Sequence, residues 1–320
     1  MDHHDSLILE ALQNNCRTSL TEIGEKVGLS RFAVRERIKK LFEDNIILGP
    51  TVVVNPLRIG LRRTVFFEFK TNPHEPWLAK LLERDASCDL SDGISGEYSL
   101  FARFRLVDDE HFVQVLKRMD DAMGKSYFKK YRVVNAIRTF KENGVICSAE
   151  EKNWIELDEI DFRILEILLN QVAYMKQPLP LSTVGLSQLL HDFGVEISQP
   201  AVFNRLSRLE KRGIVIRHTI MVDYSRLGLH MKFTVRIKAN PNFYDHVAQE
   251  FLAPMHEISD LYRTGEEYGL LTILRVRNVK EYNSFLLRLY SSKDILDTYT
   301  TLVLEERKNA PISFHRLARS

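Results

Sequence analysis

The chain has 320 residues, of which 44% are hydrophobic and 28% are charged, and its formal net charge is +2. This composition excludes extensive disorder and is typical of a globular protein with two or more domains, while the small net charge favours no particular partner. No apolar run is long enough to span a bilayer, and the polar start MDHHDSLILE is unlike a secretory signal, so we expect a cytoplasmic protein without a membrane partner. The cysteines Cys16, Cys88 and Cys147 lack the spacing of a disulfide framework or a metal site.

Residues 1–60 carry three short helical patterns and a strand pattern. The helical patterns occupy residues 5–12, 19–27 and 30–42, and Gly28 provides the turn between the second and the third. The segment IILGPTVVVN then predicts two short strands around its Gly-Pro pair. Three helices followed by a β-hairpin are typical of a winged helix-turn-helix domain.

Residues 61–148 alternate in a different way. They read as a strand (TVFFEFK), a helix (PWLAKLLERD), two strands around Gly96, a helix (DEHFVQVLKRM) and a last strand (RVVNAIRTF). This βαββαβ order predicts a ferredoxin-like domain. Its helices cover one face of the sheet, and we expect the alternating apolar residues Val65, Phe67 and Phe69 to lie on the other face, buried against a second sheet.

The chain then repeats itself. The segment SRFAVRERIKKL at residues 30–41 matches SQPAVFNRLSRL at residues 198–209, and SGEYSLFARFRL matches TGEEYGLLTILRV, while the second copy carries an insertion within LNQVAYMKQPLPLSTVG. These matches predict a second winged helix-turn-helix domain at residues 149–229 and a second ferredoxin-like domain at residues 230–320. The expected fold class is therefore α+β, with two copies of a winged helix-turn-helix domain followed by a ferredoxin-like βαββαβ domain. In the second sheet, the expected buried face carries Phe233, Val235 and Ile237.

The third helix of each helix-turn-helix has an apolar side and a polar side. In the first copy, Val34, Ile38 and Leu41 define the apolar side, and the polar side is mostly basic. A helix of this kind fits the major groove of double-stranded DNA, although charge on an outer face is also ordinary for a solvated helix. The repetition of the pattern in both copies favours DNA as the partner. The outward or first-turn residues predicted to contact it are Arg31, Arg35, Lys39, Lys40, Gln199, Asn204, Ser207 and Arg208.

Four segments carry a family resemblance, namely LILEALQNN, SLTEIGEKVGLSRFAVRERIKKLFEDNII, SGEYSLFARFRL and GEEYGLLTILRVRNVKEYNSFL. They resemble the Lrp/AsnC family of leucine-responsive, feast/famine transcription regulators, whose usual member has one unit per chain. The resemblance implies a winged domain that binds DNA, and a ferredoxin-like domain, called RAM, that dimerises sheet to sheet and often binds an amino acid at the interface. It also places four more residues on or beside the recognition helices: Ser30, Arg37, Ser198 and Arg205.

The same resemblance implies a small-molecule effector, such as an amino acid, near the turn between the second and third strands of each RAM domain. A glycine in an ordinary β-turn with polar neighbours explains the same positions. Because the apolar sheet faces must be buried, we expect an intramolecular pseudo-dimer of the two halves or a homodimer of chains. The implied effector residues are Gly96, Glu97, Tyr98, Gly265, Glu266, Glu267 and Tyr268.

Two other classes of function stay open. Some siroheme decarboxylases share this architecture, including fused forms, so a siroheme decarboxylase-like enzyme is the alternative to a regulator. The chain shows no nucleophile with a base, no phosphate-binding loop and no metal-ligand spacing, so we expect no catalytic residues, no metal, no cofactor and no enzymatic activity. A RAM-type interaction protein without DNA binding is the third class, and it requires both basic helices to be buried.

Overall fold

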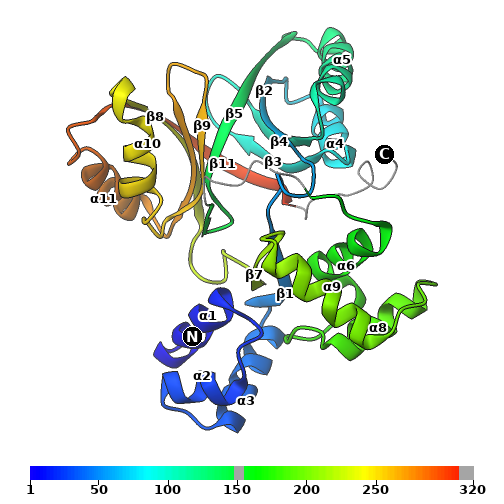
Figure 1. Cartoon of the computed structure of the whole chain (residues 1–320). Helices are drawn as coiled ribbons and strands as arrows, with labels where there is room; N and C mark the ends of the chain where they lie inside the picture. Colours follow the sequence, from blue (N-terminus) through cyan, green and yellow to red (C-terminus); the bar gives the residue numbers. More distant parts are fainter. Residues whose placement is uncertain (148–154, 310–320) are drawn as a thin grey trace. The chain divides into compact units, whose positions relative to one another are not determined.

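The computed structural model describes residues 1–147 and 155–309 and divides the chain into two compact units. The helical unit comprises Met1–Ile59 and Ile155–Gly228, and the barrel unit comprises the other described residues (Figure 1). Each unit therefore combines a segment from the first half of the chain with one from the second half. The predicted domain boundary at residues 148 and 149 and the last residues of the predicted second RAM domain, 310–320, lie outside the described residues. Among the described residues, no helix is long and apolar enough to cross a membrane.

The first part of the helical unit contains α1 (His3–Asn14), α2 (Leu20–Val27) and α3 (Arg31–Glu43), which confirm the three predicted helical patterns. Gly28 ends α2 with a φ of +71°, and the Ser30 hydroxyl caps α3. Apolar side chains from all three helices are buried against one another, and this packing fixes α2 and α3 as a helix-turn-helix. The central ones are Ile8, Leu12, Ile23, Val34 and Ile38.

The second part of the helical unit contains α6 (Glu159–Leu169), the short α7 (Gln171–Tyr174), α8 (Thr183–Asp192) and α9 (Gln199–Lys211). Helices α6, α8 and α9 lie where the repeat predicts three helices, and α7 lies within the predicted insertion. Pro200 stands in the first turn of α9, where its missing N–H removes no hydrogen bond of the helix. The buried apolar residues of this part include Ile164, Leu168, Leu186, Val202 and Leu206.

One strand, β1 (Ile47–Val54), replaces the predicted hairpin around Gly49 and Pro50, so that prediction is wrong. β1 pairs antiparallel with β7 (Val215–Val222), which follows the helices of the second half. The physical reason is the length of the ladder. A hairpin within so short a segment has strands of only a few residues, and an isolated hairpin is marginally stable at best, whereas β1 and β7 pair along their whole lengths.

This two-stranded sheet joins the two parts of the helical unit. Thr51 on β1 donates a hydrogen bond through Oγ1 to the backbone oxygen of Leu169 in α6, at 3.1 Å. Thr219 on β7 donates in the same way to the backbone oxygen of Gln13 in α1, at 2.9 Å. Each strand therefore packs on helices of the other half, and the two parts of the helical unit are held together by shared hydrogen bonds and a shared core.

The first half of the barrel unit has the predicted order of elements. These are β2 (Arg63–Lys70), α4 (Pro76–Arg84), β3 (Cys88–Ile94), β4 (Leu100–Leu106), α5 (Asp109–Lys125), β5 (Lys130–Glu142) and the short β6 (Val145–Ile146). β2 pairs with β4 and β5, and β3 pairs with β4. This pairing confirms the ferredoxin-like βαββαβ prediction for the first half.

The second half of the barrel unit has the same order. Its elements are β8 (Met231–Ala239), a 3₁₀ turn (Pro241–Phe243), α10 (Tyr244–His246), a π-helical segment (Val247–Leu252), β9 (Ile258–Thr264), β10 (Leu270–Val276), α11 (Val279–Leu289) and β11 (Ile295–Asn309). β8 pairs with β10 and β11, and β9 pairs with β10. Figure 1 shows α4 and α5 outside one half of the sheet and α10 and α11 outside the other.

The two halves share one sheet, which closes on itself. β5 pairs with β9 of the second half as well as with β2, and β11 pairs with β3 of the first half as well as with β8. The strand order β2-β4-β3-β11-β8-β10-β9-β5 therefore returns to β2. The predicted intramolecular pairing of the halves is confirmed, and it uses strand edges as well as faces, so each of these strands has two neighbours.

The prediction of which sheet face meets the other half is wrong. Val65, Phe67 and Phe69 pack with residues of α4 and α5, such as Leu78 and Val115, on the helix-covered face. Alternation could not separate the two faces because closure buries both of them, and β2 is buried along all of its central residues. The second half has the same arrangement. Phe233, Val235 and Ile237 lie on the face of the sheet that the helical segments α10 to α11 cover.

The face inside the ring carries the other residues of each strand. Phe66, Phe101 and Tyr262 form part of an apolar cluster there. Charged side chains share this interior, and Glu68 and Arg103 are almost fully buried. Buried charges of this kind need partners, so the interior is a set of specific ion pairs as well as an apolar core.

Candidate DNA-binding and effector sites

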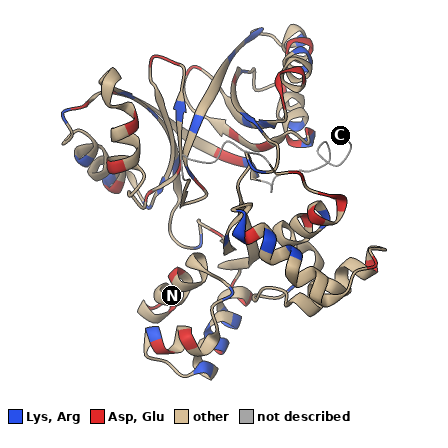
Figure 2. Ribbon diagram, in the orientation of Figure 1, with Lys and Arg blue, Asp and Glu red and all other residues tan. Residues whose placement is uncertain are grey.

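Helix α3 presents a basic and solvent-exposed surface. The side chains of Arg31, Arg35, Lys39 and Lys40 are exposed, and Lys39 makes only a long contact of 3.7 Å with Glu43. Figure 2 shows several Lys or Arg positions in blue along this helix. Positive side chains without a close buried partner are available to neutralise phosphates.

Ser30 has a structural function at the start of α3. Its Oγ accepts the backbone N–H of Ala33, with an N to Oγ distance of 3.2 Å. This hydrogen bond satisfies one of the free N–H groups of the first turn and fixes where the helix begins. Ser30 therefore sets the position of Arg31, which follows it directly, on the outer surface.

Arg37 points away from the exposed surface and binds the start of α1. Its Nη1 donates to Asp2 Oδ2 and to Asp5 Oδ1, at 2.7 Å each. A backbone hydrogen bond from Asp5, followed by the bond from Arg37, lowers the pKa of Asp2 from 3.8 to about 2. The structure thus gives Arg37 the function of fixing α3 against α1.

The second half repeats this arrangement with Arg205 in the position of Arg37. Arg205 Nη1 donates to Asp158 Oδ2 at 2.6 Å and to Asp161 Oδ1 at 2.9 Å. Arg208 Nη2 donates to Asp161 Oδ2 at 2.5 Å, and Asp161 is fully buried. Both predicted DNA contacts therefore hold α9 against α6. Local sequence patterns do not reveal this because the aspartates lie more than 40 residues away along the chain.

Uncharged polar side chains form part of the exposed surface of α9, beside Phe203, Arg208 and Lys211. Gln199 donates through Nε2 to Thr183 Oγ1 at 3.0 Å, and Asn204 is exposed. Ser207 is half-buried, and Ser198 caps the helix by position without a hydrogen bond from its side chain. α9 therefore offers amide and hydroxyl groups where α3 offers cations.

Two exposed phenylalanines also lie on these helices. Phe32 in the first turn of α3 is 72% exposed, and Phe203 on α9 is 57% exposed. The helical wheel places Phe203 outward, and the same wheel turns Phe32 away from the stripe of Val34 and Ile38. Phe32 is not among the predicted contacts because those are all charged or polar residues.

The first predicted effector residues lie at the turn between β3 and β4. Gly96 has a φ of +106°, as expected for glycine in a tight turn. Lys130 Nζ donates to Glu97 Oε1 at 2.6 Å, which lowers the pKa of Glu97. The Tyr98 ring centroid is 5.8 Å from Lys130 Nζ and 5.4 Å from the guanidinium carbon of Arg132. The turn is therefore surrounded by cations of β5.

The second predicted effector residues, Gly265, Glu266, Glu267 and Tyr268, lie at the turn between β9 and β10. Gly265 is not among the described glycines with a positive φ, so its turn differs from that of Gly96. Lys238 Nζ donates to Glu267 Oε1 at 2.7 Å. Tyr268 Oη donates to Asp297 Oδ2 at 2.6 Å, and this bond raises the pKa of Tyr268 to about 12.

Tyr299 on β11 brings residues of both turns together. A Cβ atom placed on Gly96 would lie 3.7 Å from Tyr299 Oη, and the ring centroids of Tyr268 and Tyr299 are 6.4 Å apart. The guanidinium carbon of Arg236 lies 5.5 Å from the Tyr299 ring centroid. Gly265 lies elsewhere, since a Cβ atom on it would be 3.6 Å from Ile137 of β5. The surroundings of Tyr299 are thus polar, aromatic and cationic.

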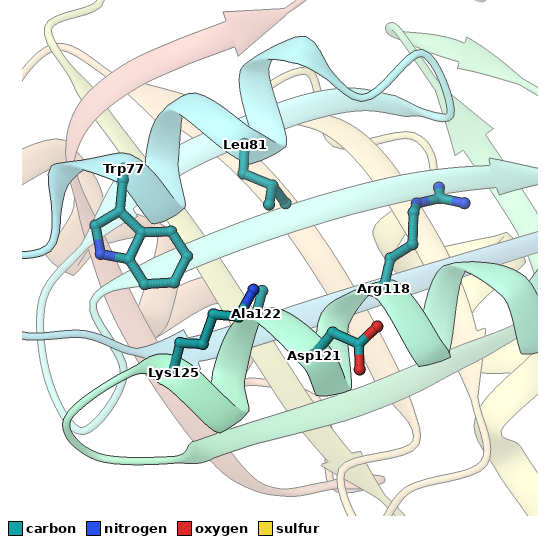
Figure 3. A pocket seen from close by; sticks show the side chains of 6 residues that line it. All are labelled: Trp77, Leu81, Arg118, Asp121, Ala122 and Lys125. Carbon is teal, nitrogen blue, oxygen red and sulfur yellow. The ribbon is translucent and has the colours of Figure 1, made fainter.

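A separate groove of about 550 Å³ lies between α4 and α5 on the outside of the barrel unit. Trp77 and Leu81 of α4 face Arg118, Asp121, Ala122 and Lys125 of α5 across it (Figure 3). None of the predicted effector residues lines this groove. Within the described part of the chain, no group of three or more His, Cys, Asp or Glu side chains is placed to hold a metal ion.

Comparison with known proteins defines the class. Residues 1–41 match the AsnC-type helix-turn-helix domain, and residues 232–312 match the Lrp/AsnC ligand binding domain. An uncharacterized HTH-type transcriptional regulator of Pyrococcus abyssi is 35% identical over 150 residues, which are 46% of this chain and 97% of that protein. The HTH-type transcriptional regulator FL11 of Pyrococcus horikoshii is 29% identical over 154 residues, 48% of this chain and 93% of that protein. The chain belongs to the Lrp/AsnC family of transcription regulators.

A solved structure resembles the whole chain. The crystal structure of the siroheme decarboxylase NirDL covers 99% of this chain and 96% of its own, with a TM-score of 0.66 and 14% sequence identity. A second structure of NirDL, in complex with an iron-uroporphyrin III analogue, has a TM-score of 0.65. At this identity the similarity is one of fold, so a regulator family and an enzyme share the architecture.

Proposed function

We propose that the chain is a sequence-specific DNA-binding transcription regulator and a tandem duplication of the Lrp/AsnC unit, with α3 and α9 as its recognition helices. The exposed basic surface of α3 is the observation that carries this proposal, because Arg31, Arg35 and Lys39 lie on a capped helix inside the segment that matches the AsnC-type domain. Cations in this position release counterions from phosphates and fix the helix in the major groove.

The two recognition helices read DNA differently. α3 supplies cations, which bind phosphates or guanine, whereas α9 supplies Gln199 and Asn204, whose amides suit adenine. The shared sheet of β1 and β7 holds the two helix-turn-helix regions at a set spacing. The chain therefore recognises two unlike half-sites.

An effector such as an amino acid binds beside Tyr299 in the barrel unit. This proposal rests on the approach of Gly96 and Tyr268 to the same tyrosine and on the nearby guanidinium of Arg236. A guanidinium pairs with a carboxylate, and aromatic rings form an apolar wall for the rest of a small ligand.

DNA binding is tested with the double variant Arg35→Ala and Lys39→Ala. We expect weaker binding to genomic DNA fragments in a gel-shift assay, and a slope of log K against log salt reduced by about 2, since two phosphate contacts are lost. The matched control is Lys80→Ala with Arg84→Ala on α4, which removes the same charge from two exposed positions. Equal binding by both double variants would remove α3 from the DNA-binding surface.

A siroheme decarboxylase-like enzyme is the second candidate, and the whole-chain similarity to NirDL favours it. Titration of the purified protein with siroheme, followed by absorption spectroscopy, separates the two. A regulator leaves the siroheme spectrum unchanged and shifts DNA, whereas the enzyme binds siroheme and converts it. The third class, an interaction protein with buried basic helices, disagrees with the exposed side chains of α3.

A further inference from the structure

Glu68 and Arg236 occupy the same position in the two halves of the barrel unit. Glu68 on β2 lies opposite Phe101 of β4 and Arg132 of β5. Arg236 on β8 lies opposite Leu271 of β10 and Tyr299 of β11. The strands and registers correspond, so a rotation that exchanges the halves exchanges these two residues.

The two residues also touch each other. Arg236 Nη2 donates to Glu68 Oε1, although β2 and β8 are not neighbours in the sheet, so the contact crosses the interior of the ring. Glu68 is 2% exposed and Arg236 is 7% exposed. Equivalent residues that touch one another lie on the axis relating the two halves, which is where a symmetric pair of identical halves brings each residue against its own copy.

Like charges at this position oppose the pairing of identical halves. Two copies of the first half would bury Glu68 against Glu68, and two copies of the second half would bury Arg236 against Arg236. Each arrangement buries two like charges close together and lacks the ion pair between Glu68 and Arg236. Glu68 keeps its ion pair with Arg132 of its own half in any pairing, whereas Arg236 meets this carboxylate only when a second half pairs with a first half.

A second buried contact also joins the two halves. Arg103 of β4 donates through Nη1 to Asp260 Oδ1 at 3.1 Å and to Tyr262 Oη at 2.7 Å, both on β9 of the other half. The register of β3 against β4 places Leu90 where β9 has Asp260. The same register places Asp92 where β9 has Tyr262, so a pair of first halves would still offer Arg103 a carboxylate, and this contact alone does not select the partner.

We infer that Glu68 and Arg236 are specificity residues for assembly, which restrict each half-barrel to a partner of the opposite kind. The partner of a first half-barrel is a second half-barrel, from the same chain or from a second copy of this chain, and never another first half-barrel. Specificity of this kind rests on repulsion in the wrong pair as much as on attraction in the right one.

Charge reversal in the full chain tests this inference. In Arg236→Glu both half-barrels carry an acid at the axis, and in Glu68→Arg both carry a base, so neither chain can close its own barrel without burying like charges. When the two variants are mixed, each acidic half-barrel of Arg236→Glu can pair with the basic half-barrel of the opposite kind in Glu68→Arg. We expect two-chain complexes containing one copy of each variant, detected by light scattering and by different affinity tags.

Each variant alone should melt about 10 °C or more below the wild type, because a buried charge faces its like. The matched control reverses the exposed pair Arg277 and Glu281 of the barrel unit, which should change the melting temperature by little. If a variant does not fold alone, the two variants are co-expressed with different affinity tags. A complex that carries both tags should then be recovered only when both chains are present.

The neutral variants Glu68→Gln and Arg236→Gln separate charge from packing. They should close within one chain, as the wild type does, and form no mixed complex. The inference is wrong if Arg236→Glu has the same melting temperature as the surface control. It is also wrong if the two charge-reversed chains, mixed or co-expressed, form no complex with each other. Neither result depends on DNA binding, so the proposed function is tested separately.

Discussion

The aspartates at the starts of α1 and α6 combine two functions at the scale of single residues. Asp2 and Asp158 cap their helices, and each also accepts a hydrogen bond from an arginine, Arg37 of α3 or Arg205 of α9. A carboxylate at a helix N-terminus is favoured by the helix dipole, and the arginine adds a second stabilising partner. One ion-pair arrangement, repeated in both halves, thus orients α3 and α9.

The lowered pKa of Asp2 predicts a dependence of stability on pH. The folded pKa of about 2 lies below the ordinary value of 3.8, so the charged carboxylate stabilises the folded state above pH 3.8, and this contribution is lost as the pH falls toward 2. Asp2→Asn keeps a capping side chain and removes the charge. We expect it to melt below the wild type at pH 5, with a difference that shrinks toward pH 2. Asp121→Asn on exposed α5 is the control, and a difference that stays constant across this range would contradict the ion-pair account.

The exposed Phe32 predicts a preference for thymine in the half-site of α3. An aromatic side chain in the first turn of a recognition helix can contact the thymine methyl group in the major groove. Replacing thymine by deoxyuridine removes only that methyl, and its burial is worth about 0.8 kcal/mol, or about four-fold in affinity. Wild-type protein should bind the deoxyuridine duplex more weakly, and Phe32→Ala should bind both duplexes equally. A deoxyuridine effect that persists in Phe32→Ala would assign the contact to another residue.

At the scale of elements, helices and strands were predicted well and their partners were not. α2 and α3 begin at serine caps and repeat apolar residues with the helical period, and such signals lie within a few residues. The partner of β1 lies in the other half of the chain, and no local pattern encodes that pairing. The prediction of a hairpin around Gly49 and Pro50 was wrong for this reason.

The candidate DNA-binding residues show the same limit. Charge and the helical wheel identified Arg31 and Arg35, which the structure leaves exposed. The wheel also selected Arg208, and the family resemblance added Arg205. Their aspartate partners at the start of α6 became visible only in three dimensions. A periodic pattern shows which side of a helix is polar, and it does not show which polar side chains already have partners.

The close packing of β1 on α7 predicts an intolerance at Gly49. Gly49 has a φ of +145°, and a Cβ atom there would overlap the side chain of Val172. Gly49→Ala should therefore lower the free energy of unfolding by about 1–3 kcal/mol, from backbone strain and overpacking. Gly124→Ala in α5 is the control, because nothing lies within 4 Å of its Cβ position, and it should be neutral or slightly stabilising. Equal unfolding curves for the two variants would contradict the packing of β1 on α7.

At the scale of the whole molecule, the duplicated pattern predicted two matched halves. It did not predict that their strands form one closed sheet. Sequence alternation predicted a buried face for β2, and the closed ring buries both faces of that strand. The inner face was missed because its charged residues, such as Glu68 and Arg236, look like solvent-exposed positions until their partners are known. Closure also leaves no free strand edge among the eight ring strands, so chains whose barrels are closed associate through another surface.

Selection of binding sites from a random pool of double-stranded DNA tests the central claim most directly. The account predicts enriched sequences with two unlike half-sites, about one helical turn or a multiple of it apart, because α3 and α9 differ in chemistry and are held by one sheet. The half-site lost in Arg35→Ala should differ from the half-site lost in Asn204→Ala. A pool without enrichment, or an enriched perfect palindrome that both variants weaken equally, would contradict it.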